Sequence, residues 1–408
     1  MRFSAARFRS PGFRLTWCAS LAWAGGLWME RVAVGWITLQ TSDDAGAVGI
    51  VFALRMLPFL LFGLISGTLA DRFPRRLCLM VTTGSSALAS VILGYLSLHG
   101  PMPVWVLGLF SFVSGTIYVF DTPARGALVV DMLGRENAAS AIAVNSVAQR
   151  FFGAVGAFAG GMVIPILGAS GSFFLIACVY VVAFLLIVPI HAPVVARDHA
   201  SIERSFTRQV MNTAHMIVRY PTIRMVVCIS IVAEFFGYSH QAALPTVARD
   251  ILLIGSEGLG LLTAMSSIGA TCIVIILAGL PRGVPRAPMV TATLILWGLT
   301  LIALGNSTSV PLSLMVIFLV GMCASSIDTL QQTLAQLAVP EAERGRAVGV
   351  WVFGIGLNVV GLFQVGQLTS HFGAPVALTL NGLFAIGGAF VIMTLAPSFR
   401  LSMMRAAR

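Results

Sequence analysis

The sequence predicts an all-α integral membrane protein whose twelve transmembrane helices form two pseudo-symmetric bundles of six. Hydrophobic residues make up 58% of the chain and charged residues only 10%, whereas a soluble domain carries about 25% charged residues. Apolar runs of about 20 residues, enough to cross a bilayer, recur along the whole chain. These runs are long and continuous, which favours helices over the short alternating strands of a membrane barrel.

Twelve apolar segments are separated by breaks that contain turn residues such as Gly, Pro, Asn and Asp. The breaks are short except for the one between the sixth and seventh segments. The predicted segments cover residues 15–40, 48–70, 77–97, 103–125, 138–166, 171–190, 222–247, 257–280, 287–305, 310–337, 346–369 and 374–396.

The distribution of arginine predicts the orientation in the membrane. All 25 basic residues are arginine. If the breaks alternate between the two sides and the N-terminus is inside, 21 arginines lie in inside breaks and termini, and one, Arg249, lies outside. Basic residues gather on the cytoplasmic side of membrane proteins. Both termini are therefore expected in the cytoplasm. The expected location is the inner membrane of a bacterium.

The chain divides into two halves that resemble repeats, which is the usual construction of secondary transporters. A shift of 211 residues brings Gly49 onto Gly260 and Pro74 onto Pro285. We expect an N-terminal bundle over 1–190, a linker over 191–221 and a C-terminal bundle over 222–408. The linker has apolar residues at helical spacing and predicts an amphipathic helix at the inner membrane surface; a plain solvated linker is the alternative.

The stretch GTLADRFPRR, residues 67–76, follows the second apolar segment. It resembles the loop signature Gly-x-x-x-Asp-Arg-x-x-Arg-Arg of the major facilitator superfamily, with the signature positions at Gly67, Asp71, Arg72, Arg75 and Arg76. PAR at 123–125 and the glycines of the fifth segment are similar to the branch that contains the enterobactin exporter and drug:proton antiporters. The resemblance covers essentially the whole chain.

This resemblance implies alternating access, in which two six-helix bundles related by an axis normal to the membrane rock about a central site. In the family, the loop Asp bonds a basic residue at the end of the fourth helix and the start of the eleventh helix. The matching positions are Asp71, Arg125 and the chain near Gly345. Such a latch would hold the cytoplasmic side closed; the alternative is that these charges only fix topology.

Several charged side chains fall inside the predicted helices, where a charge costs at least ~2.5 kcal/mol and marks a pathway or a pair. In the resembled family the first, fourth, seventh and tenth helices line the cavity, and each carries an acid in this chain. A static ion pair or an interfacial charge is the alternative for each. The predicted cavity residues are Glu30, Arg31, Asp121, Asn145, Gln149, Arg150, Glu234 and Asp328.

Glu234 is predicted to carry the exchanged proton, with Glu30 as the second candidate. Glu234 lies near the middle of the seventh segment, and no basic residue occurs between Met225 and Tyr238. Desolvation disfavours an ionised carboxyl without a partner, so this group suits proton exchange. Glu30 is followed by Arg31, and one of the two is expected to face the cavity while the other reaches a different helix.

The fifth segment carries a stripe of polar and small residues at helical spacing. Asn145 and Gln149 lead into glycines, which permit close helix approach: Gly153, Gly156, Gly160 and Gly161. GAFAGG has Ala157 where the resembled antiporter signature has proline, and this departure weakens the case for strict antiport. Arg150, one position off the stripe, is expected to supply an anion site or to pair with a cavity acid.

Together these features predict a secondary transporter that exports a small amphipathic molecule, such as a drug, siderophore or secondary metabolite, against protons. An importer or lipid-like carrier of the same fold and a membrane sensor or scaffold are alternatives. The six cysteines lack metal or redox spacing and catalytic motifs are missing, so neither an enzyme nor a metal site is expected. The expected partners are substrate, protons and lipid, without nucleic acid or cofactor, and the protein is expected to be a monomer.

Overall fold

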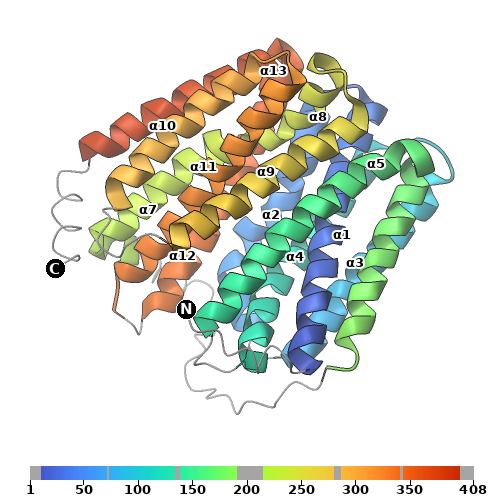
Figure 1. Ribbon diagram of the computed structural model, residues 1–408, viewed down its shortest axis with the longest axis horizontal. Helices are drawn as coiled ribbons and strands as arrows, with labels where there is room; N and C mark the ends of the chain where they lie inside the picture. The colour runs from blue at the N-terminus through green and yellow to red at the C-terminus, as the bar shows by residue number, and fades with distance from the viewer. Residues whose placement is uncertain are drawn as a thin grey trace.

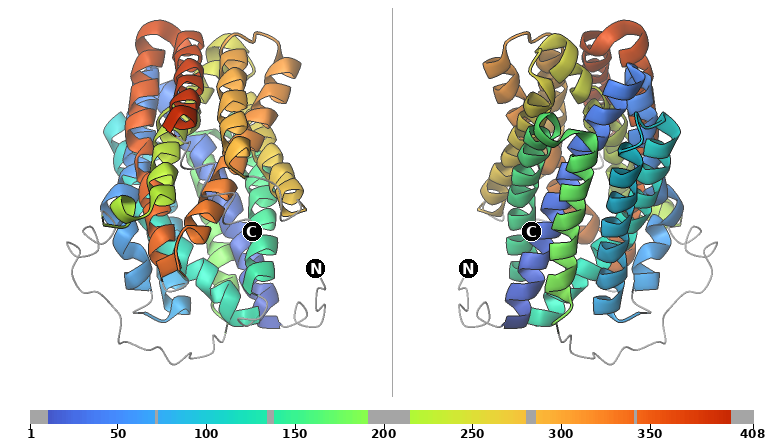
Figure 2. Two further views of the ribbon diagram at one scale, coloured as in Figure 1. Left: turned by 90° about the vertical axis from the view of Figure 1, so that its left-hand side faces the viewer. Right: turned by 90° about the vertical axis from the view of Figure 1, so that its right-hand side faces the viewer.

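The computed structural model describes residues 11–70, 73–133, 138–190, 215–279, 286–340 and 343–395. Within these ranges the protein is helical and contains no β-strand. The helices stand side by side along one common direction (Figure 2). The all-helical class predicted from the apolar runs is therefore confirmed for this part of the chain.

The helices of the N-terminal half match the predicted apolar segments closely. Both α1 and α2 begin a few residues earlier than predicted, and only Asp43 and Asp44 separate the two helices. The helices are α1 (Pro11–Ser42), α2 (Ala45–Ala70), α3 (Arg75–Ser97), α4 (Val104–Leu133) and α5 (Ala138–Ile187).

The C-terminal half begins with a helix that changes its pitch. α7 (Pro221–Val232) continues into a π turn, η4 (Ala233–Gly237), a 3₁₀ turn, η5 (Tyr238–Ala242), the short α8 (Leu244–Thr246) and a second π turn, η6 (Val247–Ile251). The remaining helices are α9 (Gly255–Ala278), α10 (Arg286–Gly305), α11 (Val310–Leu337), α12 (Arg344–Gly356) and α13 (Asn358–Leu395).

Two of the helices are folded back on themselves at a glycine. α5 covers 50 residues, about 75 Å at 1.5 Å per residue, which is more than twice the ~30 Å core of a bilayer. Gly168 in α5 has φ 69° and Gly373 in α13 has φ 82°, a left-handed conformation that glycine adopts at no steric cost. Figure 1 shows the chain of α5 turning back at this point.

Nine segments in the described residues are long and apolar enough to cross a membrane. Two of them, Val144–Ile187 and Gly349–Thr394, contain the two glycine turns. α1 is not among the nine, because Glu30, Arg31 and several small polar residues lower its hydropathy.

The two halves pack closely at the end of the molecule that holds the α1–α2 turn, here called the Asp43 end. α2 lies against α13 at Gly49 and Gly366, and α5 lies against α9 at Gly161 and Gly260. At both crossings a Cβ atom added to either glycine would come within 3.0 Å of the facing backbone. Gly49 and Gly260 are the pair that the 211-residue shift brings together, and each takes part in one of the two crossings.

The predicted amphipathic linker helix falls mostly outside the described residues, which resume at 215. Residues 215–219 are helical and lead directly into α7. This part of the chain lies at the opposite end of the molecule from Asp43, here called the Arg75 end, where Arg219 approaches Glu343 of the α11–α12 connection at 4.0 Å.

Candidate functional site

Glu30 is enclosed within the N-terminal half by three other helical segments. It is 1% exposed. Its Oε1 accepts hydrogen bonds from Arg55 of α2 and Ser114 of α4, each at 2.5 Å. Its Oε2 accepts one from Tyr180 in the second part of α5 at 2.8 Å. Because a charge, a hydroxyl and a phenol all point at this carboxylate, the ionised form is fully compensated and the site resembles a structural ion pair.

Asp121 and Arg125 form a second buried pair, one helical turn apart in α4. The guanidinium donates to both carboxylate oxygens at 2.7 and 2.9 Å, and Thr82 of α3 donates to Asp121 at 2.7 Å. The aromatic ring of Trp23 stacks on Arg125, with 4.5 Å between the guanidinium carbon and the ring centre. In this structure Asp121 is therefore paired with Arg125 and lies within the N-terminal half.

Glu234 and Asp328 of the C-terminal half have no basic group within 4.0 Å among the described residues. Glu234 is 5% exposed, and its Oε2 accepts a hydrogen bond from Asn358 at 3.1 Å. Asp328 of α11 accepts one from Tyr238 at 2.6 Å. The two carboxyl groups are near enough to interact electrostatically. This acidic cluster, Glu234, Tyr238, Asp328 and Asn358, contrasts with the paired acids of the N-terminal half.

Glu234 lies in the π turn η4, where the regular α-helix of the seventh segment ends. The turn packs tightly: a Cβ added to Gly237 would lie 2.6 Å from the Trp297 ring, and one added to Gly361 would lie 2.7 Å from the Glu234 carbonyl oxygen. Single π turns within helices occur frequently at functional sites. Here the turn presents a carboxyl group that a continuous α-helix would place elsewhere.

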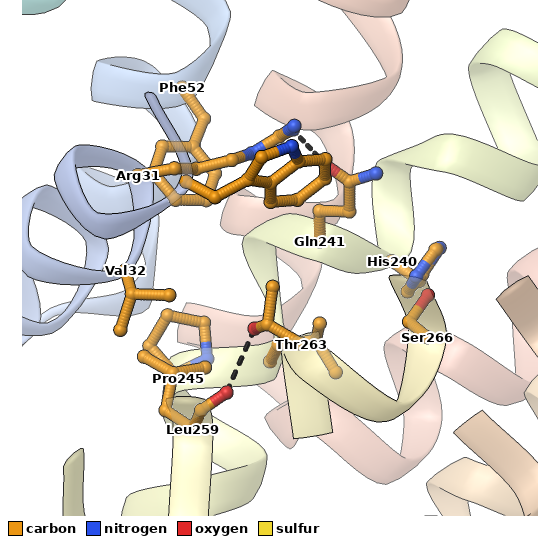
Figure 3. Close-up of a pocket in the computed structure, with 11 residues that line it drawn as sticks. Arg31, Val32, Phe52, His240, Gln241, Pro245, Leu259, Thr263 and Ser266 are labelled. Carbon is orange, nitrogen blue, oxygen red and sulfur yellow. Dashed lines mark hydrogen bonds between the residues drawn. The ribbon is translucent and has the colours of Figure 1, made fainter. Parts of the chain in front are cut away.

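Arg31 reaches from the N-terminal half to the C-terminal half. Its guanidinium donates to the Gln241 side chain of η5 and lies 5.2 Å from the centre of the Trp28 ring and 5.8 Å from that of Phe52. Figure 3 shows these groups at the edge of a pocket between the halves. The pocket has a volume of about 40 Å³, and its other lining residues are Val32, His240, Leu244, Pro245, Leu259, Thr263 and Ser266.

The polar residues predicted on the fifth segment lie in α5 near the other half. Asn145 is buried, and its Oδ1 has no hydrogen-bond partner among the described residues. Gln149 and Arg150 are partly buried. Arg150 interacts electrostatically with Asp328 and Tyr238 across the boundary between the halves. Arg31 and Arg150 thus contribute positive charge from one half, opposite the acidic cluster of the other.

The glycine stripe of α5 lies against α1 and α9. A Cβ added to Gly153 would meet Trp28 at 2.6 Å, one on Gly156 would meet the Gly25 carbonyl oxygen at 2.2 Å, and one on Gly160 would meet the Met29 backbone at 2.8 Å. Gly161 faces α9 instead, and a Cβ added to it would lie 2.4 Å from the Ser256 carbonyl oxygen. The stripe therefore sets the distance between α1 and α5 beside the pocket.

The loop signature is only partly within the described residues. Asp71 and Arg72 lie outside them, while Gly67 lies near the end of α2. Arg75 forms an ion pair with Asp131 of α4 at 2.5 Å and donates to the Ala127 carbonyl oxygen at 2.9 Å. Arg76 donates to the Val188 carbonyl oxygen. Arg125, the predicted partner of Asp71, bonds Asp121 in this structure.

Ion pairs also join the two halves at the Asp43 end. Arg249 of η6 reaches Asp43 at 2.7 Å and its neighbour Asp250 at 2.6 Å. The Ser370 hydroxyl at the end of the α13 segment before Gly373 donates to Asp44. Asp43 is 84% exposed, and exposed pairs of this kind contribute about 0–1 kcal/mol each. They fix the register of an interface that the glycine crossings hold together.

Sequence reasoning did not identify the partners of several charged residues. Arg55 was visible as a charge in the second segment, but nothing in the sequence linked it to Glu30. Nothing in a single sequence marks the neutral residues of these sites as functional. They are Ser114, Tyr180, Tyr238, Gln241 and Asn358. Their roles follow only from how the helices cross.

A family model described as "transmembrane secretion effector" matches residues 3–406. The staphyloferrin A transporter of Staphylococcus aureus is 23% identical over 366 residues, which cover 88% of this chain and 90% of that protein. The multidrug efflux pump Tap of Mycobacterium tuberculosis H37Rv is 24% identical over 385 residues, covering 90% of this chain and 88% of the pump.

Solved transporters share the fold at low sequence identity. The nucleoside transporter NupG superposes with a TM-score of 0.75 at 13% identity, covering 95% of this chain and 100% of the transporter. The xylose transporter XylE from E. coli, solved in an inward-open conformation, gives a TM-score of 0.70 at 14% identity and covers 95% of this chain and 96% of XylE.

Proposed function

We propose, from the premise that this chain belongs to the transmembrane secretion effector family of major facilitator transporters, that it exports a small amphipathic molecule in exchange for protons. The observation that carries the proposal is Glu234, a buried carboxyl on a π turn that has no basic partner among the described residues. The relatives include a protein named as a multidrug efflux pump, which favours export over import.

We place twelve spans in the membrane. The nine apolar segments contain two that are divided at Gly168 and Gly373, and α1 adds the twelfth. Six spans precede the linker and six follow it, which gives two bundles. The arginine bias supports an orientation with both termini in the cytoplasm, and we propose that the membrane is the inner membrane of a bacterium. The Asp43 end then faces outward and the Arg75 end faces the cytoplasm.

In this orientation the structure represents a state that is closed on the outside. The glycine crossings Gly49–Gly366 and Gly161–Gly260 and the Asp43–Arg249 ion pair all lie at the outer end. Substrate would enter from the cytoplasm, and the halves would then rock apart at the Asp43 end to release it. Since the pocket beside Arg31 holds only about 40 Å³, a whole substrate must extend beyond it.

Proton exchange fits Glu234 better than the other predicted acids. Glu30 and Asp121 each have an arginine within 2.7 Å, so protonation would break a compensated pair. Glu234 has the Asn358 amide and a second carboxyl, Asp328, nearby, and no arginine lies within 4.0 Å of it in the described part of the chain. Two carboxyl groups in a low-dielectric site resist being ionised together. One proton can therefore enter and leave this cluster without disrupting an ion pair.

The loop latch belongs to the other state of the cycle. We propose that Asp71 competes with Asp121 for Arg125 when the cytoplasmic side closes. In the present structure Arg125 donates to both oxygens of Asp121, so a latch of this kind would require Arg125 to exchange one carboxylate for the other. The protein is proposed to work as a monomer, with the proton gradient as its energy source and no cofactor.

Transport into inside-out membrane vesicles tests this function. A panel of amphipathic compounds should be screened with and without a pH gradient that is acid inside the vesicle. Proton-coupled export predicts uptake of at least one compound that stops when the gradient is collapsed by an uncoupler. Uptake that continues unchanged without the gradient, or no uptake of any compound, would contradict the proposal.

A further inference from the structure

We propose that the pocket beside Arg31 is the subsite for an anionic group of the substrate, so that the transported molecule is an amphipathic carboxylate. This inference rests on the proposed export function and specifies its substrate class. It depends on the charge balance of the N-terminal half, the position of Arg31 between the halves and the chemistry of the pocket wall.

In the described part of the chain, no acid lies within 4.0 Å of the Arg31 guanidinium. Among the described residues, the other intramembrane arginines of α2 and α4 have acids within 4.0 Å: Arg55 has Glu30 and Arg125 has Asp121. Arg31 is next to Glu30 in the chain, yet both oxygens of that carboxylate are taken by Arg55, Ser114 and Tyr180. An intramembrane cation without an acid is costly and marks a functional site by default.

The neighbours of Arg31 stabilise its charge without neutralising it. The guanidinium lies near the faces of Trp28 and Phe52, an arrangement that favours a cation. Its one hydrogen-bond acceptor among the described residues is the Gln241 side chain, which is neutral. Because a guanidinium carries five N–H donors in a planar fork, most of them stay available for a ligand. Carboxylates match this fork with two parallel hydrogen bonds.

The pocket has the size and lining for a head group. A volume of about 40 Å³ has room for a few water-sized groups, which suits a carboxylate but not a whole amphipathic molecule. Ser266 and His240 add polar atoms on the far wall, and His240 is held by its Nδ1 contact with the Gly237 carbonyl oxygen at 2.6 Å. Val32, Leu244 and Leu259 supply an apolar floor, as Figure 3 shows for Val32 and Leu259.

Location between the halves links this subsite to transport. Arg31 belongs to α1 and Gln241 to η5, so their hydrogen bond must break when the halves separate at the Asp43 end. A bound carboxylate would replace Gln241 as the acceptor. The rest of the substrate could then extend along the boundary toward Arg150 and the acidic cluster, where it would meet the proposed proton site.

A matched trio of fluorescent compounds tests the inference: pyrenebutyrate, its methyl ester and pyrenebutylammonium. Binding to the full chain in lipid nanodiscs can be followed by energy transfer from tryptophan. The acid should bind more tightly than the ester and the amine. Arg31→Gln should weaken binding of the acid by about tenfold or more, as expected for a lost charged hydrogen bond, and leave the ester unchanged.

Three further variants make the result specific. Arg219→Gln removes another arginine that stacks on an aromatic ring, Tyr220 at 5.3 Å, but is 60% exposed and far from the pocket; it should not change binding of any compound. Gln241→Ala removes the protein's own acceptor and should keep or raise affinity for the acid. Arg31→Lys keeps the charge without the planar fork and should give an intermediate affinity.

The outcomes separate this inference from the proposed function. Preference for the ester or the amine, no binding of any of the three, or equal effects of Arg31→Gln and Arg219→Gln would overturn the anionic subsite. If the vesicle screen then still shows gradient-driven uptake of neutral or cationic compounds, the export function stands without it. Loss of gradient-driven uptake for every compound would instead overturn the function.

Discussion

Gly49 of α2 and Gly366 of α13 meet with so little space that a Cβ atom on either would lie 2.6 Å from the Cα of the other. The contact joins the two halves of the transporter at the Asp43 end. At the other crossing, a Cβ added to Gly161 would lie 2.8 Å from the Cα of Gly260. Because such distances do not tolerate a side chain, the closed Asp43 end depends on glycine at these positions.

Replacing Gly366 by leucine should therefore open the Asp43 end. The added side chain cannot fit against Gly49, so the population should shift toward the state in which the two halves separate there. Distances between spin labels on the two halves at that end should lengthen. Gly387→Leu, in the same helix with no atom within 4 Å of its added Cβ, is the matched control and should leave the distances unchanged. Equal distances in the two variants would contradict the close crossing.

Glu30→Gln should destabilise the protein far more than Glu234→Gln. The first change leaves Arg55 buried without its acid. Removing one partner of a buried ion pair costs about 3–5 kcal/mol of stability. No arginine of the described segments lies within 4.0 Å of Glu234, so its amide variant should melt near the wild-type temperature. Thermal unfolding in detergent compares the two variants directly. Adding Arg55→Met to Glu30→Gln should restore much of the loss, and similar melting of both single variants would show that Glu30 is not structural.

Acid on the Asp43 side should loosen the contact made by Asp44. The hydrogen bond from Ser370 holds the pKa of the Asp44 carboxyl below its usual range. A lowered pKa in the closed state means that the contact stabilises closure above the ordinary pKa, about 3.9, and that this stability is lost as pH falls through the lower value. Spin-label distances at this end should stay constant from neutral pH to about pH 5 and lengthen below about pH 4.

Ser370→Ala tests the cause of that shift. Without the hydroxyl, the pKa of Asp44 in the closed state should return toward its ordinary value. Closure should then be weaker at neutral pH and should change less when the pH falls, because the pKa values of the closed and open states become more alike. His371 and Arg249 also lie near this carboxyl or its neighbour Asp43, and their charges are unchanged in the variant. An acid response as large as that of the wild type would assign it to another group.

Asp71→Asn should slow transport while leaving folding nearly intact. The loop charge is proposed to select the state in which the cytoplasmic side is closed, and neutralising it removes that bias. Labelling of single cysteines in the cytoplasmic cavity should increase in the variant. Thermal stability should change by less than in Glu30→Gln. Unchanged transport and labelling would mean that Asp71 serves only to set the topology.

The helices and their approximate ends were predictable because lipid demands long apolar runs, and glycine and proline mark the breaks between them. The predicted segment 310–337 coincides with α11. The pitch change at Glu234 was not predictable, since π and α turns have similar local sequence requirements. The same holds for the partner of Glu30: four segments converge on that carboxylate, and only their tertiary packing selects Arg55 rather than the adjacent Arg31.

The presence of a charge in a predicted helix does not show whether the residue has a structural or a functional role, whereas the structure separates the acids by their partners. Every acid within a predicted helix has a similar cost of burial in the membrane, so cost alone marks each of them as a candidate. A single sequence does not show which acids are paired. The structure divides them into Glu30 and Asp121, each with an arginine, and Glu234 and Asp328, which have none within 4.0 Å among the described residues. Sequence reasoning favoured Glu234 because its own helix lacks a nearby base, which is a local property and therefore readable.

Gradient-driven transport by Glu234→Gln in proteoliposomes tests the proton-coupling account most directly. The substrate is the compound identified by the vesicle screen, and each preparation is assayed for uphill transport driven by a pH gradient and for exchange between equal pools of labelled and unlabelled substrate. Glu257→Gln, which alters a carboxyl at the Asp43 end of α9, is the control. We predict that Glu234→Gln loses gradient-driven transport but keeps exchange, while Glu257→Gln keeps both; gradient-driven transport at the wild-type rate in Glu234→Gln would contradict the assignment.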